Sequence, residues 1–475
     1  MAAASARFAI ATPLCPPVHA SAARARLLQP LSSFSKHSTA ISTTTIATAT
    51  MPRRPYSASY SSSFSSSSSS SAFSSTPSSA ASSAASSAVS ASPSSVTSAK
   101  KPPRFSYNIA ASFIAKDRPF DASMHVFHFN PYNRIQPPRH RRRSSRPESG
   151  HDAFFASRVH ETGGAVAFGV ADGVGGWVDS GVDPADFSHG FCDYMASAAW
   201  EHQPAAAAAA AADTTSAAAA TPANSLSARK LMQLGYDAIC ADKTVLAGGS
   251  TACVAVASPD GRLDIANLGD SGFLQLRLNA VHSYSEPQTH AFNTPFQLSI
   301  VPPSVAARMA AFGGTQLSDL PRDADVTSHR LRHGDVLVLA TDGVLDNLFN
   351  QDVLRVASRV MGATGAWTVG DAGQIQVAEN LDAIVRSPIK LAQSRGGNTR
   401  QQQQSERTVT LQSLLATELV LAAKRASVNT KQDGPFAKEV QKYYPQENWH
   451  GGKIDDICVV AVVVVEDPVS TPSKL

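Results

Sequence analysis

Two apolar runs that each end in Asp-Gly constrain the fold of this 475-residue chain more than any other feature. AVAFGVADG occupies 165–173 and DVLVLATDG occupies 335–343. Runs of this kind predict buried strands, so Asp172 and Asp342 each stand at the end of one. An unpaired buried carboxylate is costly, and neither aspartate has an arginine or lysine close by in the sequence. The fold must therefore bring positive charge to both strand ends.

Further acids occupy similar strand boundaries. They are Asp152, Asp270, Asp346 and Asp455. Taken alone, each is an ordinary turn or cap residue. If they converge on one end of a sandwich, they will repel one another unless cations lie between them. Oxygen ligands of this type suit Mg²⁺ or Mn²⁺ and not zinc. Two such ions about 3.5–4 Å apart can activate a water and clamp a phosphate, and Gly173 would let its backbone carbonyl approach a metal closely.

The pattern of apolar residues predicts an α+β fold built on antiparallel sheets. We expect strands over 105–114, 152–159, 165–171, 250–257, 262–268, 272–278, 335–340 and 457–465. We expect helices over 183–200, 226–242, 351–361 and 408–427. The turn Pro259-Asp260-Gly261 joins two of the strands as a hairpin, because proline presets its dihedral and glycine accepts positive φ. Hairpin connections of this kind favour antiparallel sheets over regular helical crossovers.

Residues 1–104 have the composition of an organellar transit peptide followed by a disordered Ser-rich segment. They are rich in Ser, Ala, Thr and Arg, and the first acidic residue of the chain is Asp117. This predicts import into the mitochondrion, and its matrix, in preference to the chloroplast; an untargeted disordered tail is the alternative. Because the basic excess lies in this segment, the remainder is acidic, and we expect no nucleic-acid partner.

The folded domain is expected over 105–466, with a tail over 467–475. Alanine-rich sequence near 204–223 and Gly-, Asn- and Gln-rich sequence near 370–407 predict disordered insertions. The five cysteines form no C-x-x-C pair, which argues against a disulfide framework or a zinc site. No stretch of 18 apolar residues is present, so no transmembrane segment is expected.

Six segments together resemble the PPM-type metal-dependent phosphatases, the protein phosphatase 2C family. They are HDAFF, FGVADGVGGW, GSTACVAV, ANLGDSG, LVLATDGVLDN and GKIDDICVVAVVV, and they occur in the order of that family. DGVGGW and ATDGVLDN, with the transit-like start, resemble its mitochondrial branch. The resemblance implies a four-layer αββα sandwich of two mainly antiparallel sheets flanked by helices. It also implies hydrolysis of phosphoserine and phosphothreonine in protein substrates, with mitochondrial phosphoproteins as partners. The nucleophile would be a water or hydroxide bridging two Mg²⁺ or Mn²⁺ ions, and no phosphoenzyme would form.

The resemblance assigns roles to the strand-edge acids by motif. Asp172 is implied to bridge both metals, and Gly173 to offer its carbonyl. Asp342 and Asp455 are implied to bind the first metal, which makes them catalytic together with Asp172. Asp152 is implied to contact the site through a metal-bound water.

Three further aspartates take lesser roles in the same comparison. Asp270 and Asp346 match the acids of a weaker third metal site. Asp456 stands beside the ligand Asp455, where many relatives have asparagine, and is interpreted as a support for the ligands rather than as one of them.

Three departures from the family pattern bear on mechanism. His151 stands where many relatives have a glutamate. Val174 replaces a histidine that is a proposed general acid, so the leaving group must receive its proton from a metal-bound water or another group. The arginine that holds the substrate phosphate in relatives has no clear counterpart here, and Arg146 and Arg158 are the two candidates. An arginine fork would suit a phosphate.

Three other functions compete with this one. A nucleic-acid or membrane-binding protein is suggested by the basic N-terminal segment, but processing would remove much of that segment, and the remainder has no basic face in sequence. A catalytically weak pseudophosphatase would use the same fold as a binding or regulatory module, although Asp172, Asp342 and Asp455 all remain. A serine hydrolase is suggested by Gly-Asp-Ser-Gly at 269–272, with Ser271 as its nucleophile, but no G-x-S-x-G elbow is present.

Overall fold

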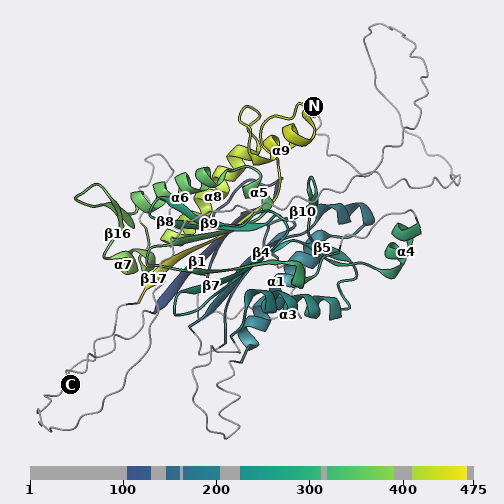
Figure 1. Cartoon of the computed structure of the whole chain (residues 1–475), viewed down its shortest axis with the longest axis horizontal. Coiled ribbons are helices and arrows are strands. Elements are labelled where there is room, and N and C mark those ends of the chain that lie inside the picture. The colour runs from purple at the N-terminus through teal and green to yellow at the C-terminus, as the bar shows by residue number, and fades with distance from the viewer. Residues whose placement is uncertain are drawn as a thin grey trace, which may run out of the picture. The chain divides into compact units, whose positions relative to one another are not determined.

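The computed structural model describes residues 104–129, 146–160, 164–203, 225–311, 318–389 and 409–467 (Figure 1). Of the predicted transit and Ser-rich segment, 1–104, all residues but the last lie outside the described ranges. The predicted insertion at 204–223 and all but the first residue of the predicted tail lie outside them as well.

Two antiparallel sheets form the centre of the domain. The six-stranded sheet has the order β2 (Val126–His128), β1 (Phe105–Ile114), β17 (Ile457–Glu466), β14 (Val336–Ala340), β8 (Gly272–Arg277) and β9 (Ala280–Tyr284). The five-stranded sheet has the order β13 (Asp325–Arg330), β7 (Arg262–Leu268), β6 (Ala252–Ala257), β4 (Val166–Asp172) and β3 (Asp152–Arg158). Every neighbouring pair within these two sheets is antiparallel.

The valine-rich, apolar character of β17 follows from burial on both of its faces. Val460, Val462 and Val464 point into the core between the sheets, where Phe168 of the other sheet also lies. The alternate residues of β17, such as Val459, enter the core beneath the covering helices. Because successive strand residues point to opposite faces, a strand covered on both sides needs an unbroken apolar run.

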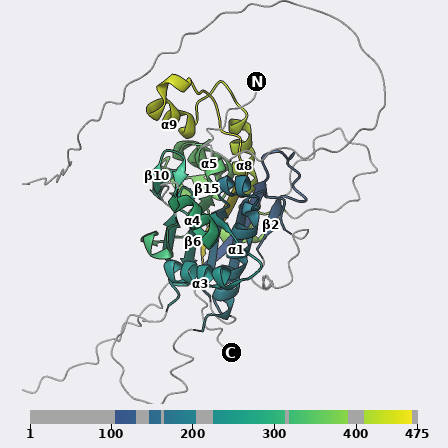
Figure 2. The same cartoon turned by 90° about the vertical axis from the view of Figure 1, so that its right-hand side faces the viewer.

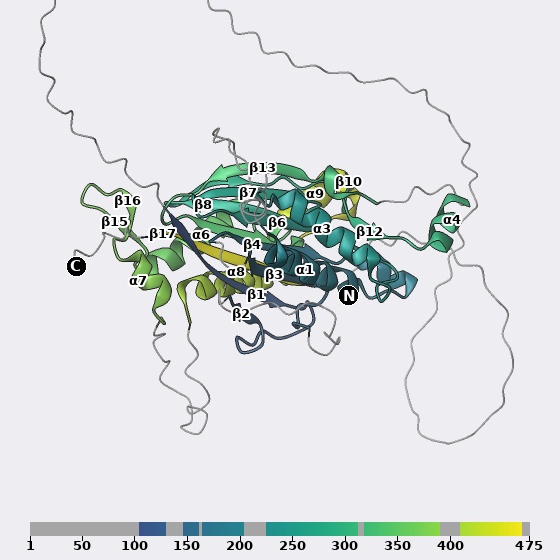
Figure 3. The same cartoon turned by 90° about the horizontal axis from the view of Figure 1, so that it is seen from below.

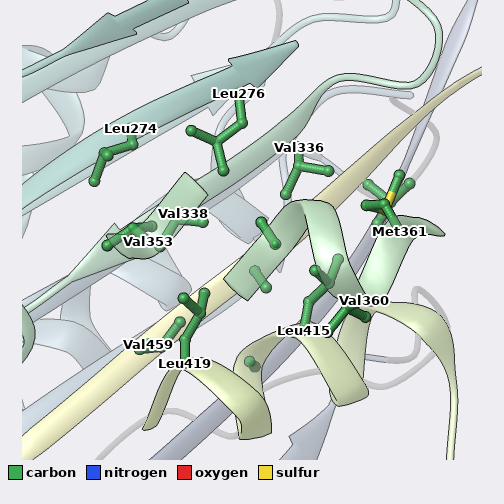
Figure 4. Packing of buried hydrophobic residues seen from close by; sticks show 14 of the residues in the cluster. Leu274, Leu276, Val336, Val338, Val353, Val360, Met361, Leu415, Leu419 and Val459 are labelled. Atoms are coloured by element: carbon green, nitrogen blue, oxygen red, sulfur yellow. The ribbon is translucent and has the colours of Figure 1, made fainter. Parts of the chain in front are cut away.

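Helices cover the outer face of each sheet. Over the six-stranded sheet lie α6 (Asn350–Ala363), α7 (Leu381–Arg386) and α8 (Leu411–Ser427). Figure 4 shows Leu419 of α8 next to Val459 of the sheet and Val353 of α6 next to Val338. Over the five-stranded sheet lie α1 (Pro184–Glu201) and α3 (Ala228–Ala241), which Figure 3 shows in front of β3, β4, β6 and β7. The predicted αββα sandwich is therefore confirmed.

The predicted strands and helices match the observed ones to within a few residues. The helix α1 begins where expected, because the side chain of Asp183 accepts a hydrogen bond from Ala185 N at 3.1 Å and Pro184 fills the first helical position. Gly261 has φ of +80°, as the predicted hairpin turn requires.

One predicted insertion is partly folded. The segment expected to be disordered from 370 contains β16 (Ile375–Val377), which pairs with β15 (Trp367–Val369) just before the segment, and then α7. Leu381 and Val385 of α7 are buried against the sheet, which explains why this part orders despite its polar composition. Residues 390–408 lie outside the described residues.

Several short elements carry no clear sequence signal. They are β5 (Gly248–Ser250), β10 (Thr289–Ala291), β11 (Thr294–Pro295), β12 (Leu298–Ile300), α4 (Pro303–Ala311), α5 (Asp342–Leu345), α9 (Pro435–Tyr443) and the 3₁₀ turns Gly175–Ser180, Pro321–Asp323 and Pro445–Glu447. Figure 2 shows α9 and β10 next to α5. Within the described ranges, no helix has the length and apolar character needed to cross a membrane.

Candidate metal centre

The pairing of β3 with β4 sets two carboxylates directly opposite each other. Asp152 is the register partner of Asp172. Like charges opposed across strands destabilise a sheet. Asp152 is fully buried; its Oδ2 accepts a hydrogen bond from Thr341 Oγ1 at 2.7 Å, whereas its Oδ1 has no partner among the described residues. The pair therefore needs a cation, and one buried carboxylate oxygen is open to receive it.

The end of β14 brings a second group of acids against the start of β17. Asp342 begins α5 immediately after β14, and Asp346 lies one turn later. A Cβ on Gly343 would stand 1.9 Å from the backbone oxygen of Asp456. Only glycine allows the two chain segments to approach this closely, and their approach brings Asp342 beside Asp455.

The loop after β4 is held by the backbone groups around it. The carbonyl of Asp172 accepts hydrogen bonds from Thr251 N at 2.9 Å and Ser250 Oγ at 2.8 Å. Gly173 N donates to the carbonyl of His151 at 3.1 Å. A Cβ on Gly173 would stand 2.7 Å from Pro184 O. Glycine is thus required here for packing, in addition to the predicted access of its carbonyl to a metal.

Lys453 lies among the carboxylates and was not singled out by sequence reasoning. Its Nζ is 2.6 Å from Oδ2 of both Asp342 and Asp346, and 3.2 Å from Oδ2 of Asp455. The residue precedes Asp455 by two positions in the GGKIDD segment. Its nearness to Asp455 in the sequence could have identified it, because a lysine two residues from a proposed ligand can reach the same carboxylate cluster.

The protonation of these groups reflects both burial and crowding. Burial raises the pKa of Asp152, Asp172 and Asp270 well above the ordinary value, and neighbouring carboxylates raise each further. Burial also raises the pKa of Asp342, against the opposing effect of Lys453. Burial alone would lower the pKa of Lys453, but the charges of the surrounding aspartates outweigh it and raise that pKa well above its usual value.

The donor set fits a hard divalent cation. Lys453 lies within 3.2 Å of three aspartates, Asp342, Asp346 and Asp455. Three more aspartates, Asp152, Asp172 and Asp270, interact with this group electrostatically. Asp270, like Asp152, has a buried Oδ1 without a hydrogen-bond partner among the described residues. Across those residues, no three His, Cys, Asp or Glu side chains converge closely enough to enclose a metal as they stand. The Lys453 ammonium lies among three of the carboxylates instead, and oxygen donors of this kind match Mg²⁺ or Mn²⁺.

Asp456 supports the centre through backbone groups. Its Oδ1 accepts a hydrogen bond from Lys116 N and its Oδ2 accepts one from His151 N, both at 2.8 Å. The carboxylate thereby fixes the residue that precedes Asp152. This arrangement matches the supporting role expected for Asp456.

The two arginine candidates occupy different places. Arg146 forms an ion pair with Asp186 and lies 3.6 Å from Asp183, at the start of α1 and next to the loop that carries Gly173. Arg158, by contrast, pairs with Val166 at the end of the β3–β4 hairpin remote from Asp152. Arg158 thus stands six positions along β3 from Asp152, and this placement favours Arg146 over Arg158 as the residue that would hold the phosphate.

The serine suggested as a hydrolase nucleophile has a structural role. Ser271 is buried, and its Oγ lies 2.8 Å from Thr251 Oγ1. Its partner is a hydroxyl and not an imidazole. This contact therefore supplies no base that could activate Ser271 as a nucleophile.

Comparisons with known proteins agree with the sequence resemblance. The model of the protein phosphatase 2C family matches residues 139–386. The human protein phosphatase PTC7 homolog is 39% identical over 207 residues, which cover 43% of this chain and 59% of the relative. The chain thus spans about three fifths of that relative's length. Protein phosphatase 2C homolog 7, mitochondrial, of Saccharomyces cerevisiae is 32% identical over 254 residues, covering 52% of this chain and 64% of the relative.

A further relative is covered more completely. The PTC7 homolog fig of Drosophila grimshawi is 30% identical over 316 residues, covering 66% of this chain and 79% of the relative. Among solved structures, the photosystem II phosphatase PBCP aligns with 75% of this chain and 98% of its own, at 20% identity and a TM-score of 0.44.

Proposed function

The chain belongs to the protein phosphatase 2C family, in the branch of the PTC7 homologues, and from that premise we propose that it is a metal-dependent protein phosphatase. Its reaction is the hydrolysis of phosphoserine and phosphothreonine in protein substrates, and its cofactors are two Mg²⁺ or Mn²⁺ ions, with a weaker third. The carboxylate cluster at the shared end of the two sheets is the proposed active site.

One observation carries the proposal. The buried carboxylate of Asp152 stands opposite Asp172 in the strand register, and its Oδ1 has no hydrogen-bond partner among the described residues. Two such carboxyls must either keep a proton, as their raised pKa values indicate for the metal-free protein, or share a compensating cation that lets both ionise. Lys453 cannot fill this need, because its Nζ is already within 3.2 Å of three other aspartates.

The proposed ligands come from five strand ends, those of β3, β4, β7, β14 and β17. Asp172 would hold both ions, with Gly173 offering its carbonyl, while Asp342 and Asp455 would hold the first. Asp152 would act through a water, and Asp270 and Asp346 would hold the third ion. When bound, the ions supply activation of a water nucleophile and neutralise charge on the phosphate.

The chain's own residues would orient the phosphate. Arg146 is the proposed phosphate-binding residue, because its guanidinium lies at the start of α1, the helix whose Pro184 packs on Gly173, and a planar guanidinium fork suits two phosphate oxygens. Asp186 holds that guanidinium in place. We expect Arg146→Lys to raise KM for a phosphopeptide, since lysine keeps the charge but loses the fork.

Mitochondrial import is proposed on two grounds. Residues 1–104 have a transit-like composition, and the yeast relative is named mitochondrial. The matrix is the proposed compartment. A fluorescent fusion of the full chain should localise to mitochondria and be protected from protease in mitoplasts, and a fusion that lacks 1–104 should not.

The decisive experiment measures phosphate release from a phosphothreonine peptide by the full chain with Mn²⁺ and with EDTA. We expect turnover only with Mn²⁺, and loss of it in Asp172→Asn and Asp342→Asn. Asp260→Asn is the matched control, because Asp260 belongs to an Asp-Gly pair in an exposed hairpin turn. A folded protein that binds Mn²⁺ but does not release phosphate would overturn the proposed phosphatase activity. It would favour the pseudophosphatase that acts as a binding or regulatory module.

A further inference from the structure

Exposed aromatic side chains gather beside the carboxylate cluster from three distant parts of the chain. Tyr284 at the end of β9, Phe349 before α6 and Tyr443 at the end of α9 are 50%, 43% and 54% exposed. All three line one groove of about 700 Å³. Grouped exposure of large aromatic side chains marks an interaction surface rather than scattered surface residues.

The groove is continuous with the proposed active site. Asp270 and Asp346 belong to the carboxylate cluster and also line the groove. A polypeptide whose phosphate reaches the cluster would therefore run directly over the aromatic residues. Figures 1 and 2 show the elements that form this region, α9, β10 and α5, side by side.

The helix α9 forms one wall of the groove and is fixed to the rest of the domain. Phe292, between β10 and β11, has its ring 5.5 Å from that of Phe436 and 5.7 Å from that of Tyr443. Phe436 N donates a hydrogen bond to the carbonyl of Asp346 at 3.0 Å, and the ring of Phe436 lies 5.1 Å from Lys453 Nζ. A groove held in this way is preformed, which lowers the entropy lost when a ligand binds.

The charge of the groove indicates what it binds. Asp270 and Asp346 line it as members of the carboxylate cluster, where Lys453 already pairs with Asp346 at 2.6 Å. Beyond that cluster its charged lining residues are Glu286, Glu439, which lies 3.8 Å from Lys442, and one lysine, Lys438. That lysine pairs with Asp433 at 3.0 Å. Acidic and aromatic surfaces together suit a ligand that carries both a basic and an apolar side chain.

We propose that this aromatic groove binds the polypeptide that flanks the phosphorylated residue, and selects substrates with an apolar and a basic side chain near it. The inference rests on the proposed phosphatase function and adds the substrate class. Tyr443, Phe349 and Tyr284 contact the apolar side chain, and Glu286 attracts the basic one.

The test compares two phosphothreonine peptides on the full chain with Mn²⁺. One carries Leu and Arg beside the phosphothreonine, and the other carries Ala and Glu. Hydrolysis of p-nitrophenyl phosphate, which is too small to reach the aromatic residues, reports the metal centre of each variant. The variants are Tyr443→Ala and Glu286→Lys, with Leu246→Ala as control because Leu246 is 75% exposed and does not line the groove.

The unsubstituted protein should prefer the Leu–Arg peptide. In Tyr443→Ala, kcat/KM for that peptide relative to p-nitrophenyl phosphate should fall about tenfold, mainly through KM, as expected for loss of one aromatic anchor. Glu286→Lys should reduce the preference for arginine, and Leu246→Ala should change neither ratio. Equal values for both peptides, unaltered by the groove variants, would overturn the proposal.

A binding measurement separates this proposal from the phosphatase function. Fluorescence anisotropy of the labelled Leu–Arg peptide requires no turnover. If p-nitrophenyl phosphate is not hydrolysed but the peptide binds and Tyr443→Ala weakens it, the groove stands and the catalytic function fails. If hydrolysis proceeds and the two peptides bind equally, the groove fails and the catalytic function stands.

Discussion

Lys453 Nζ lies 2.6 Å from Oδ2 of Asp342, although 111 positions separate the two residues in the chain. The lysine supplies the only positive charge that the described residues place within ion-pair distance of Asp342, Asp346 or Asp455. It therefore acts as a tethered cation among the carboxylates, and a divalent ion entering the same region must compete with it.

Replacing this lysine should affect the metal-free protein most. We expect Lys453→Met to lower the free energy of unfolding in EDTA by about 3 kcal/mol, because it leaves buried carboxylates without their partner. With saturating Mn²⁺ the loss should be smaller, and the affinity for Mn²⁺ measured by calorimetry should rise. Lys438→Met, which breaks an exposed ion pair with Asp433, should cost less than about 1 kcal/mol. Equal effects of Lys453→Met with and without Mn²⁺ would show that the ammonium does not compete with the ion.

Asp172→Asn should separate stability from activity. Removing one of two opposed carboxylates relieves repulsion with Asp152, so the metal-free protein should gain about 1 kcal/mol. The same change removes a proposed ligand, so Mn²⁺-dependent turnover should fall more than about 100-fold. Thermal unfolding in EDTA and phosphopeptide hydrolysis with Mn²⁺ check the two effects. A variant that is less stable in EDTA would contradict the repulsion.

The stability of the metal-free protein should fall as pH rises. The pKa values of Asp152, Asp172 and Asp270 are raised in the folded protein, so it retains protons that the unfolded chain has released. The free energy of unfolding therefore declines from the ordinary carboxyl pKa, about 4, upward through the raised values. Asp242 and Asp433 have lowered pKa values, so their contribution to the free energy of unfolding is lost only as pH falls below about 4.

Mn²⁺ should oppose this decline, because it binds the ionised carboxylates and its stabilising effect grows with pH. Urea unfolding at a series of pH values, in EDTA and in Mn²⁺, gives both curves. A metal-free protein that becomes more stable as pH rises above about 5 would show that these carboxyls are already ionised in the folded state.

The sequence predicted the sheets better than it predicted their surroundings. The apolar runs of β4, β14 and β17 are buried on both faces, so their patterns identified them and the aspartates at their ends. Lys453 was missed because it lies in a polar loop, and only the pairing of β14 with β17 brings it to Asp342. The groove was missed because β10 and β11 are short and α9 buries only Ala437 and Val440. The two strands are too short to show a periodicity. In α9, Phe436, Val440 and Tyr443 do recur at helical spacing, but the helix has only nine residues.

The junction between β14 and β17 offers the sharpest test of the site's geometry. In Gly343→Ala the added Cβ would meet Asp456 O at 1.9 Å, so one strand end must shift. We expect a loss of about 3 kcal/mol in urea unfolding and a marked loss of Mn²⁺-dependent turnover, because Asp342 and Asp455 would move apart. Gly175→Ala is the matched control, since a Cβ there would have no heavy atom within 4 Å. It should be neutral or stabilising by about 0.5 kcal/mol. If the two variants behave alike, the junction can relax, and the close approach of the two strands is not what holds the two aspartates together.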